Sequence, residues 1–272
     1  MEEIQAIPLE TGSFQGRIHL EYDCPEIRKA LSDCGSLLAD ARTKILLDSR
    51  NLVGALTIRS CSTHDFDVVI KEYRDNLLGR WKTRFQPSRA RRAWRNASVL
   101  VRGGIPTPRP IAYLEQKEGR LVGRNYFIME WLKGTEEIRY PLMELSGRPL
   151  QALIEALARF VAEIHAAGIL HHDLSDGNIL IRPKQEGGYH FFLVDIKRVR
   201  FRREIGRFRA VGNLVRLGIP RRNQHDFLVS YLNRNPGTLW WWYRFNKIRF
   251  STRITLKKKL GLKKLAKKLK LH

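Results

Sequence analysis

The hydrophobic pattern of the chain changes near the middle, from short β-like runs to a long helical one. The first half contains runs rich in Val, Ile, Phe and Tyr, including FDVVIKEYR at residues 66–74 and NYFIMEWL at 125–132. One helical stretch, SRARRAWRNASVLVRGG at 88–104, interrupts these runs and ends at paired glycines. This pattern predicts a small lobe dominated by a β-sheet, with one inserted helix.

The second half begins with a helix and continues into a polar loop. The apolar residues of 150–170 recur at i, i+3, i+4 and i+7, which is typical of a core helix. They are Leu150, Leu153, Ile154, Leu157, Val161 and Ile164. The loop LHHDLSDGNILI and the strand HFFLVDI follow, separated by a glycine turn at 187–188.

Together the two halves predict an α+β protein with two lobes. We expect a β-rich N-lobe over 1–132 and a shortened, mainly helical C-lobe over 133–242, followed by a basic amphipathic tail over 243–272.

Four polar residues occur in an order that suits phosphoryl transfer. Lys71 lies in the strand run DVVIKEY, Asp173 and Asn178 stand five residues apart in the loop, and Asp195 ends the next apolar strand. Transfer from ATP needs a lysine on the phosphates, two side chains that bind magnesium and an acid beside the attacking hydroxyl. The loop matches the kinase pattern H-R-D-x-x-x-x-N, with His172 in place of the arginine.

Each of these residues, taken alone, has a plainer interpretation. Asp and Asn cap turns, and a lysine on an alternating strand is often solvated. His171 and His172 could bind a metal, although a histidine beside a catalytic aspartate more often serves as a scaffold hydrogen-bonder. The shared order of the four residues favours a catalytic centre, because independent caps have no reason to reproduce it.

Two departures from the general kinase pattern are visible. The loop DSRNLVG contains only Gly54 and lacks G-x-G-x-x-G, so fewer backbone amides can approach the phosphates. No acidic residue lies between Asp75 and Glu115, so the 88–104 helix offers no glutamate to pair with Lys71. Glu115 is the candidate outside that helix. Both departures leave room for a non-catalytic relative.

The positive charge is concentrated at the C-terminal end. From Ile196 onward there are 23 Lys and Arg against two acids, a net charge of +21. The first 195 residues hold 27 basic and 25 acidic residues, a net charge of +2. A nearly neutral body with a basic extension argues against a protein that coats nucleic acid over its whole face. Residues 79–102 also carry eight Lys or Arg and no acid, which suggests an acidic acceptor.

The tail combines lysines with a leucine stripe. LGLKKLAKKLKLH at 260–272 places Leu262, Leu265 and Leu269 on one helical face, and the aromatic run WWWYRF lies upstream at 240–245. This combination is typical of a segment that lies on an anionic membrane. An RNA-binding arm and a disordered tail are the alternatives, and the leucines favour the membrane over nucleic acid.

Other classes are disfavoured by simple features. Cys24, Cys34 and Cys61 show no metal-ligand spacing and are expected to be free thiols. No apolar run approaches the ~18 residues of a membrane-spanning helix. The acidic start of the chain does not resemble a secretory signal, so we expect the protein in the cytoplasm unless something carries it to a surface.

Several segments resemble the lipopolysaccharide kinase family, which includes Kdo kinases and core heptose kinases. These segments are SRARRAWRNASVLVRGGIPTPRPIAYLE, YFIMEWLKG, ILHHDLSDGNILI and FFLVDIKRVRF, and the resemblance spans roughly residues 45–235. Trp94 and Asn96 in the helix, and the GIPTPRP stretch after it, are more specific to this family than the general kinase motifs.

The resemblance implies a protein-kinase-like fold, ATP and Mg²⁺ as cofactors, and a defined role for each site residue. Asp173 would be the base and Asn178 and Asp195 the magnesium ligands, with Lys71 anchoring the phosphates. The backbone of Glu130 and Leu132 would meet the adenine.

The acceptor that the resemblance implies is a sugar hydroxyl on the inner core of lipid A. The reaction would then take place at the cytoplasmic face of the inner membrane of a Gram-negative bacterium. Two alternatives stay open: an atypical serine/threonine kinase of the RIO type, and a pseudokinase adaptor that binds anionic membrane or RNA.

Overall fold

The structure is a computed structural model in which residues 5–59 and 65–259 are described. The chain divides into two compact units. The N-terminal unit comprises Met1–Lys133 together with the short segment Asp195–Lys197, and the C-terminal unit comprises Gly134–Val194 and Arg198–His272.

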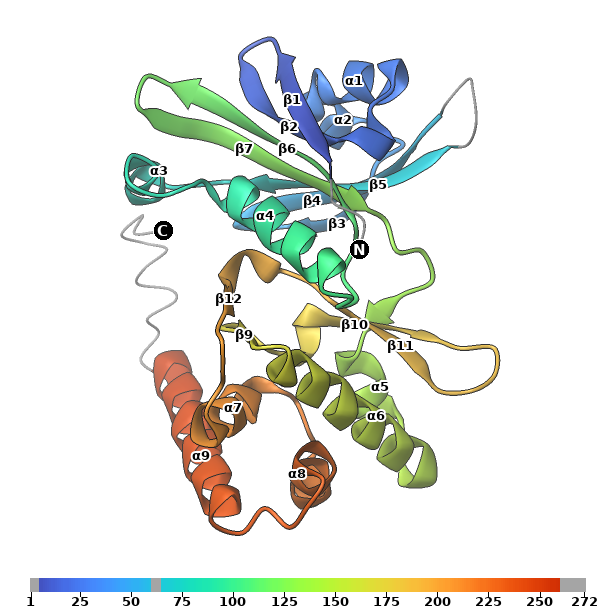
Figure 1. The fold of residues 1–272 in the computed structure, drawn as a ribbon, viewed down its shortest axis with the longest axis vertical. Helices are drawn as coiled ribbons and strands as arrows, with labels where there is room; N and C mark the ends of the chain where they lie inside the picture. The colour runs from blue at the N-terminus through green and yellow to red at the C-terminus, as the bar shows by residue number, and fades with distance from the viewer. Residues whose placement is uncertain (1–4, 60–64, 260–272) are drawn as a thin grey trace. The chain divides into compact units, whose positions relative to one another are not determined.

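The N-terminal unit is built on one antiparallel sheet in the order β1-β2-β6-β7-β5-β4-β3 (Figure 1). Its strands are β1 (Ala6–Thr11), β2 (Phe14–His19), β3 (Lys44–Asp48), β4 (Asn51–Ile58), β5 (Phe66–Tyr73), β6 (Pro110–Glu118) and β7 (Leu121–Glu130). The runs expected to be strands at 66–74 and 125–132 thus form β5 and part of β7, which pair with each other.

The helices of this unit are η1 (Leu20–Tyr22), α1 (Pro25–Leu31), α2 (Cys34–Ala39), α3 (Leu77–Lys82) and α4 (Arg89–Arg102). Ala112 and Leu114 of β6 belong to a buried cluster that includes Ile27 of α1 and Leu38 of α2. Tyr113, between them, contacts Trp94 of α4 instead, with ring centroids 5.2 Å apart. Because side chains alternate along a strand, α4 covers the face of the sheet opposite to α1 and α2.

Local signals explain where α4 begins and ends. The Ser88 side chain accepts a hydrogen bond from the Arg91 N–H, which is an N-cap. At the other end Gly104 has φ +70°, a left-handed conformation that glycine adopts at no steric cost. The helix predicted to close at the paired glycines is therefore confirmed.

The C-terminal unit is mainly helical. Its helices are α5 (Arg139–Glu144), α6 (Gly147–Ala166), η2 (Asp176–Asn178), α7 (Arg207–Asn213), η4 (Leu214–Arg216), η5 (Arg221–Asn223), α8 (Gln224–Leu232) and α9 (Thr238–Lys259); η3 (Ile196–Arg198) begins in the segment that belongs to the other unit. Two small sheets accompany them, β11-β10-β8 and β12-β9. Their strands are β8 (Glu136–Glu137), β9 (Ile169–His171), β10 (Ile179–Pro183), β11 (Tyr189–Leu193) and β12 (Val199–Phe201).

Helix α6 forms the core of this unit. All six apolar residues that the helical spacing singled out are buried on it, so the expected core helix is confirmed. The predicted turn between β10 and β11 is also present, with Gly187 and Gly188 at φ +90° and +83°. A strand-rich unit and a helical unit in one chain confirm the α+β class.

The last described helix begins before the expected tail. Leu239 and Tyr243 of α9 are buried, so residue 243 lies within the packed part of this helix. The leucine stripe at Leu262, Leu265 and Leu269 lies outside the described residues. Within residues 5–59 and 65–259, no helix has the length and apolarity needed to cross a membrane.

Candidate active site

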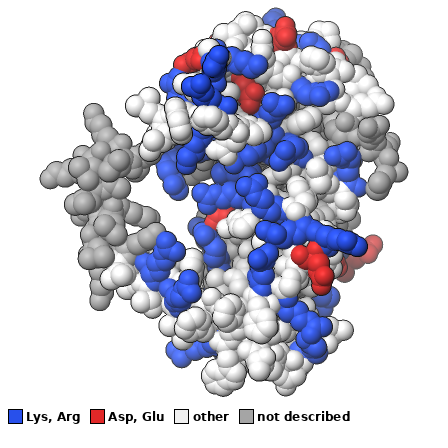
Figure 2. All heavy atoms as spheres, turned by 60° about the vertical axis from the view of Figure 1, so that its left-hand side comes forward, with Lys and Arg blue, Asp and Glu red and all other residues white. Residues whose placement is uncertain are grey.

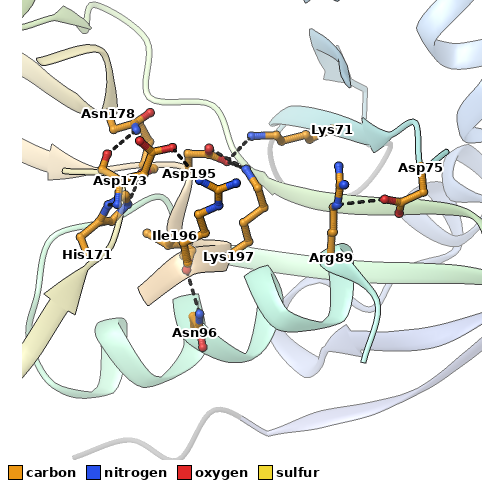
Figure 3. Close-up of polar contacts among 12 residues, drawn as sticks. Lys71, Asp75, Arg89, Asn96, His171, Asp173, Asn178, Asp195, Ile196 and Lys197 are labelled. Atoms are coloured by element: carbon orange, nitrogen blue, oxygen red, sulfur yellow. Dashed lines mark hydrogen bonds and ion pairs between the residues drawn. The ribbon is translucent and has the colours of Figure 1, made fainter. Parts of the chain in front are cut away.

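Lys71 is directed to its partner by the alternation of β5. Its neighbour Glu72 lies on the opposite face of the strand and accepts a hydrogen bond from the Arg124 Nε at 3.0 Å. The Lys71 Nζ instead lies 2.7 Å from the Asp195 Oδ1 (Figure 3). The two residues are 124 positions apart in the sequence, so the fold of the N-terminal unit brings together a lysine and an acid that were both singled out.

Asp195 is held by a second lysine as well. The Lys197 Nζ lies 2.5 Å and 2.6 Å from the two carboxylate oxygens of Asp195. Both lysine nitrogens also lie over the ring of the buried Tyr73, at 5.3 Å and 5.6 Å from its centroid. Burial alone would raise the pKa of Asp195, but the charges and hydrogen bonds of Lys71 and Lys197 outweigh it and hold the pKa far below its ordinary range.

The backbone of Asp195 is strained. Its φ of 55° lies in the left-handed region, which costs a non-glycine residue on the order of 1 kcal/mol. Such strain persists where the surroundings fix it, and here the two lysines fix the side chain. Strained residues held in this way cluster at functional sites, which supports the choice of Asp195.

The segment after Asp195 is attached to α4 through Asn96. The buried Asn96 Nδ2 donates to the Ile196 carbonyl oxygen at 2.8 Å (Figure 3). The helix that lacks a glutamate for Lys71 therefore holds the segment that carries Asp195. This gives Asn96, part of the most family-specific stretch of the sequence, a structural role.

One expectation for this unit needs correction. Glu115 was the candidate to orient Lys71, yet the ion-pair partner that the described residues give Lys71 is Asp195, while Glu115 lines a cavity beside Arg91. Gly54 is the single glycine of the loop DSRNLVG, which lacks G-x-G-x-x-G. A Cβ atom at Gly54 would lie 2.6 Å from Thr43 and 2.7 Å from Leu38, so this glycine permits close packing against α2 instead.

Sequence reasoning missed Lys197. A lysine two residues after a strand-end aspartate is ordinarily interpreted as solvated, and nothing in its spacing indicates burial. In the structure its side chain is only 13% exposed and both oxygens of Asp195 accept from it.

In the C-terminal unit, His171 supports the catalytic loop. Its Nδ1 accepts from the Asp173 N–H at 3.1 Å, so the other ring nitrogen, Nε2, is the one that donates to the Val194 carbonyl at 3.1 Å. The expected scaffold role of a histidine beside the aspartate is confirmed for His171. Val194 directly precedes Asp195 in the chain, so the loop is tied to the strand that leads to this acid.

Asp173 and Asn178 lie together in the same loop. The Asn178 Nδ2 donates to the Asp173 carbonyl oxygen at 2.7 Å, and the Asn178 carbonyl accepts from the Val194 N–H at 3.0 Å. These bonds fix the amide group of Asn178 and leave its Oδ1 as the ligand atom that it could offer a cation.

Two arginines hold the Asp173 carboxylate. The Arg216 Nη2 lies 2.5 Å from Oδ1, and the Arg198 Nη1 lies 3.5 Å from Oδ2. The guanidinium of Arg216 in turn lies over the Phe250 ring of α9, 5.5 Å from its centroid. The side chain proposed to accept a proton is therefore positioned by residues distant from it in the sequence.

Helix α9 fixes the segment that carries Arg216. The Lys247 Nζ donates to the carbonyl oxygens of Val215 and Leu217, on either side of Arg216, at 2.9 Å and 2.6 Å. Burial lowers the pKa of Lys247 to about 8, partly offset by the charge of Asp176. Residues 243–272 contain 12 Lys or Arg and no acid, so the sequence predicts that this segment faces water or an anionic partner. Lys247 departs from this because two carbonyl groups compensate its burial.

His172 replaces the arginine of the general loop pattern. Burial, followed by the charges of arginines that include Arg200 and Arg202, lowers the pKa of His172. The lowered pKa favours the neutral imidazole over the positive charge that an arginine would bring.

Glu130 is the last residue of β7, and Leu132 lies two residues after it. The Glu130 N–H donates to the Arg109 carbonyl at 2.9 Å, and the intervening Trp131 N–H donates to the Asp67 carbonyl at 2.9 Å. An adenine base could thus meet the carbonyl of Glu130 but not its N–H. The adenine contact itself stays a prediction.

The oxygen atoms of Asp195 and Asn178 are of the kind that Mg²⁺ prefers, carboxylate and amide carbonyl. Within residues 5–59 and 65–259 there is no cluster of three His, Cys, Asp or Glu side chains that could hold a metal ion.

The chain is similar to a known protein family and to several characterised proteins. The model of the lipopolysaccharide kinase (Kdo/WaaP) family matches residues 69–231. The lipopolysaccharide core heptose(I) kinase WaaP of Pseudomonas aeruginosa is 25% identical over 160 residues, which is 53% of this chain and 60% of the relative. A 3-deoxy-D-manno-octulosonic acid kinase of Xanthomonas oryzae pv. oryzae is 35% identical over 118 residues, 43% of this chain and 44% of the relative. The aligned stretches therefore span only about half of these relatives.

A solved structure has the same fold. The structure of WaaP in complex with acyl carrier protein matches with a TM-score of 0.53 at 19% identity, over 79% of this chain and 91% of that one. The two-lobed, kinase-like fold expected from the sequence is confirmed by this match.

Proposed function

Because the chain belongs to the lipopolysaccharide kinase (Kdo/WaaP) family, we propose that it transfers the γ-phosphoryl group of ATP to a sugar hydroxyl of the lipopolysaccharide inner core. The observation that carries the proposal is the ion pair between Lys71 and Asp195 at 2.7 Å. It joins the two residues that bind phosphate and metal in the general phosphoryl-transfer scheme.

Residues of the N-terminal unit would bind the nucleotide. Lys71 would hold phosphate oxygens, and the backbone of Glu130 and Leu132 would meet the adenine. Asp195, ionised because two lysines lower its pKa, would hold Mg²⁺ together with Asn178. The bound ion would neutralise the charge on the phosphates.

Asp173 would act as the base. The acceptor hydroxyl oxygen attacks the γ-phosphorus, the bond to the bridging oxygen of ADP breaks, and the hydroxyl proton passes to the Asp173 carboxylate. Arg216 and Arg198 would keep that carboxylate oriented toward the hydroxyl. The role of these arginines is positioning, because they act through Asp173.

The acceptor is proposed to be the Kdo or heptose region, which is acidic. Of the eight basic residues in 79–102, Arg80 and Arg89 are paired with Glu118 and Asp75 in the structure. Arg84 and Arg91 are exposed and line a cavity, so they remain available for an anionic ligand.

We further propose that the protein works at the cytoplasmic face of the inner membrane. Trp241, Phe245 and Ile248 of α9 are 72%, 57% and 57% exposed, at the i, i+4 and i+7 spacing of one helical face. Apolar side chains next to arginines and a lysine-rich tail suit the headgroup region of an anionic membrane.

Mass spectrometry of lipopolysaccharide from a strain that lacks the gene tests the proposal. We expect the inner core to lose one phosphoryl group, which wild-type protein restores and Asp173→Ala does not. If the lipopolysaccharide core is unchanged in the strain that lacks the gene and a protein has lost a phosphoryl group instead, the RIO-like alternative is favoured. Full restoration by Asp173→Ala would favour a non-catalytic adaptor.

A further inference from the structure

A surface of the N-terminal unit, distinct from the residues proposed for catalysis, exposes large apolar side chains. Helix α3 has no buried residue. Leu77, Leu78 and Trp81 on it are 82%, 66% and 56% exposed, and Phe85 just after it is 72% exposed. Trp81 and Phe85 contact each other edge to face, with ring centroids 5.3 Å apart. Four large apolar side chains are thus exposed within nine residues, and a protein surface rarely exposes so many together without a partner.

Polar contacts keep this segment in place. The Asn76 side chain caps α3 by accepting from the Gly79 N–H at 2.9 Å, and the Thr83 hydroxyl accepts from the Val122 N–H at 2.8 Å. Arg80 forms an ion pair with Glu118 on β6. Because these contacts bind the polar side of the segment to the sheet, its apolar side chains are presented outward.

A cavity of about 660 Å³ lies beside the patch and is rich in cations. Its lining includes Phe85 of the patch, Glu115, and four cationic residues, which are Arg84, Arg91, Lys117 and Arg120. All four are exposed. On the face shown in Figure 2, Lys and Arg likewise cover more of the N-terminal unit than Asp and Glu. A cavity with this lining suits a phosphate group, while the carboxylate of Glu115, which is only 6% exposed, could accept from a hydroxyl of the same ligand.

We infer that α3, the loop after it and the β6–β7 turn dock on an anionic membrane, with lipid phosphates held by the cavity cations. Leu77, Trp81 and Phe85 enter the boundary between headgroups and acyl chains, where an indole ring is favoured. Charge complementarity selects the membrane, because the cations surround the apolar patch as they do in interfacial segments. A nucleic acid would use the cations but not the leucines. The inference does not rest on the proposed reaction.

Sedimentation of the full chain with vesicles tests the inference. The vesicles contain phosphatidylcholine with or without phosphatidylglycerol. We expect the triple variant Leu77→Ser, Trp81→Ser, Phe85→Ser to bind the anionic vesicles at least roughly tenfold more weakly than the wild type. The matched control is Tyr140→Ser, Met143→Ser on α5, which removes apolar side chains that are 48% and 79% exposed and should bind like the wild type.

Two further experiments test the cavity charges and the contribution of the C-terminal tail separately. Arg84→Ser with Arg120→Ser should weaken binding to the anionic vesicles by roughly tenfold and leave the weak binding to phosphatidylcholine unchanged. The triple α3 variant should also weaken binding when Leu262, Leu265 and Leu269 are already serine. If the triple α3 variant has no effect in either background, the α3 surface does not bind the membrane and the inference is overturned.

Fluorescence provides a local measurement on the intact protein. Brominated phosphatidylglycerol should quench part of the tryptophan emission, and Trp81→Phe should reduce that part. Quenching that is the same in Trp81→Phe and wild type, with vesicle binding intact, would place another surface on the membrane and contradict the inference.

Discussion

Lys197 donates to both carboxylate oxygens of Asp195, at 2.5 Å and 2.6 Å. The proposed magnesium ligand is thus already occupied by a cation of the protein itself. A metal ion that binds Asp195 would lie beside the charge of Lys197, so the two cations repel each other and compete for the same carboxylate.

This competition predicts the effect of Lys197→Met. Removing a hydrogen bond to a charged group, of about 1.5–3 kcal/mol, should lower the Mg²⁺ concentration needed for half-maximal nucleotide binding by roughly tenfold. Titration of Mg²⁺ against a fluorescent ATP analogue measures this directly, with Lys184→Met, an exposed lysine of the β10–β11 turn, as control. An unchanged or higher Mg²⁺ requirement would show that Lys197 assists the metal instead.

The pairing of Lys71 with Asp195 predicts different effects of substitutions at Lys71 and at Glu115 on the use of ATP. Lys71→Met should raise the Michaelis constant for ATP severely, whereas Glu115→Gln should leave it unchanged, because Glu115 lies at the cavity and not at Lys71. Steady-state kinetics at varied ATP concentration measures the Michaelis constant of each variant. A defect in Glu115→Gln as large as that in Lys71→Met would restore Glu115 as the residue that orients the lysine.

Arg216 should matter for turnover and not for nucleotide binding. Its guanidinium holds the Asp173 carboxylate at 2.5 Å, and a base misplaced by about 1 Å can lose up to roughly 100-fold in rate. We expect Arg216→Ala to lower the turnover number and to leave the dissociation constant for ATP unchanged, with the exposed Arg221→Ala as control. Equal turnover in Arg216→Ala and the control would remove Arg216 from the positioning of Asp173.

The lowered pKa of Lys247 makes stability depend on pH. The folded pKa is about 8 and the ordinary value is 10.5, so between these values the unfolded chain binds more protons than the folded one. The contribution of Lys247 to the free energy of unfolding should therefore rise as the pH increases from 8 to 10.5, by at most about 3 kcal/mol. Urea unfolding at pH 7.5 and 10 should show this rise in wild type and a smaller one in Lys247→Met. The same rise in both proteins would contradict the assignment.

The elements that sequence predicts well are those with strong periodicity. Helix α6 repeats its apolar residues over about four turns, and each of the six is buried. Strands β1 and β2 were not anticipated because each contributes a single buried residue, Leu9 or Ile18, and so shows no alternation that a pattern could detect.

The candidate site residues were identified by their order along the chain and not by residue type alone. Lys71, Asp173, Asn178 and Asp195 were singled out because their order follows the phosphoryl-transfer scheme. The roles of Lys197, Asn96 and Arg216 depend on contacts between segments far apart in the chain, such as the 100 residues between Asn96 and Ile196. No local pattern encodes those contacts, so only the folded structure reveals them.

The central claim is that this chain phosphorylates an inner-core sugar with Asp173 as the base. Purified wild-type and Asp173→Asn proteins are incubated with ATP, Mg²⁺ and lipopolysaccharide from the strain that lacks the gene. The mass of the product is then determined by mass spectrometry. The prediction is that wild type adds one phosphoryl group to the Kdo or heptose region, while Asp173→Asn binds ATP normally and adds none. Transfer by Asp173→Asn at the wild-type rate, or no transfer by the wild type, would contradict it.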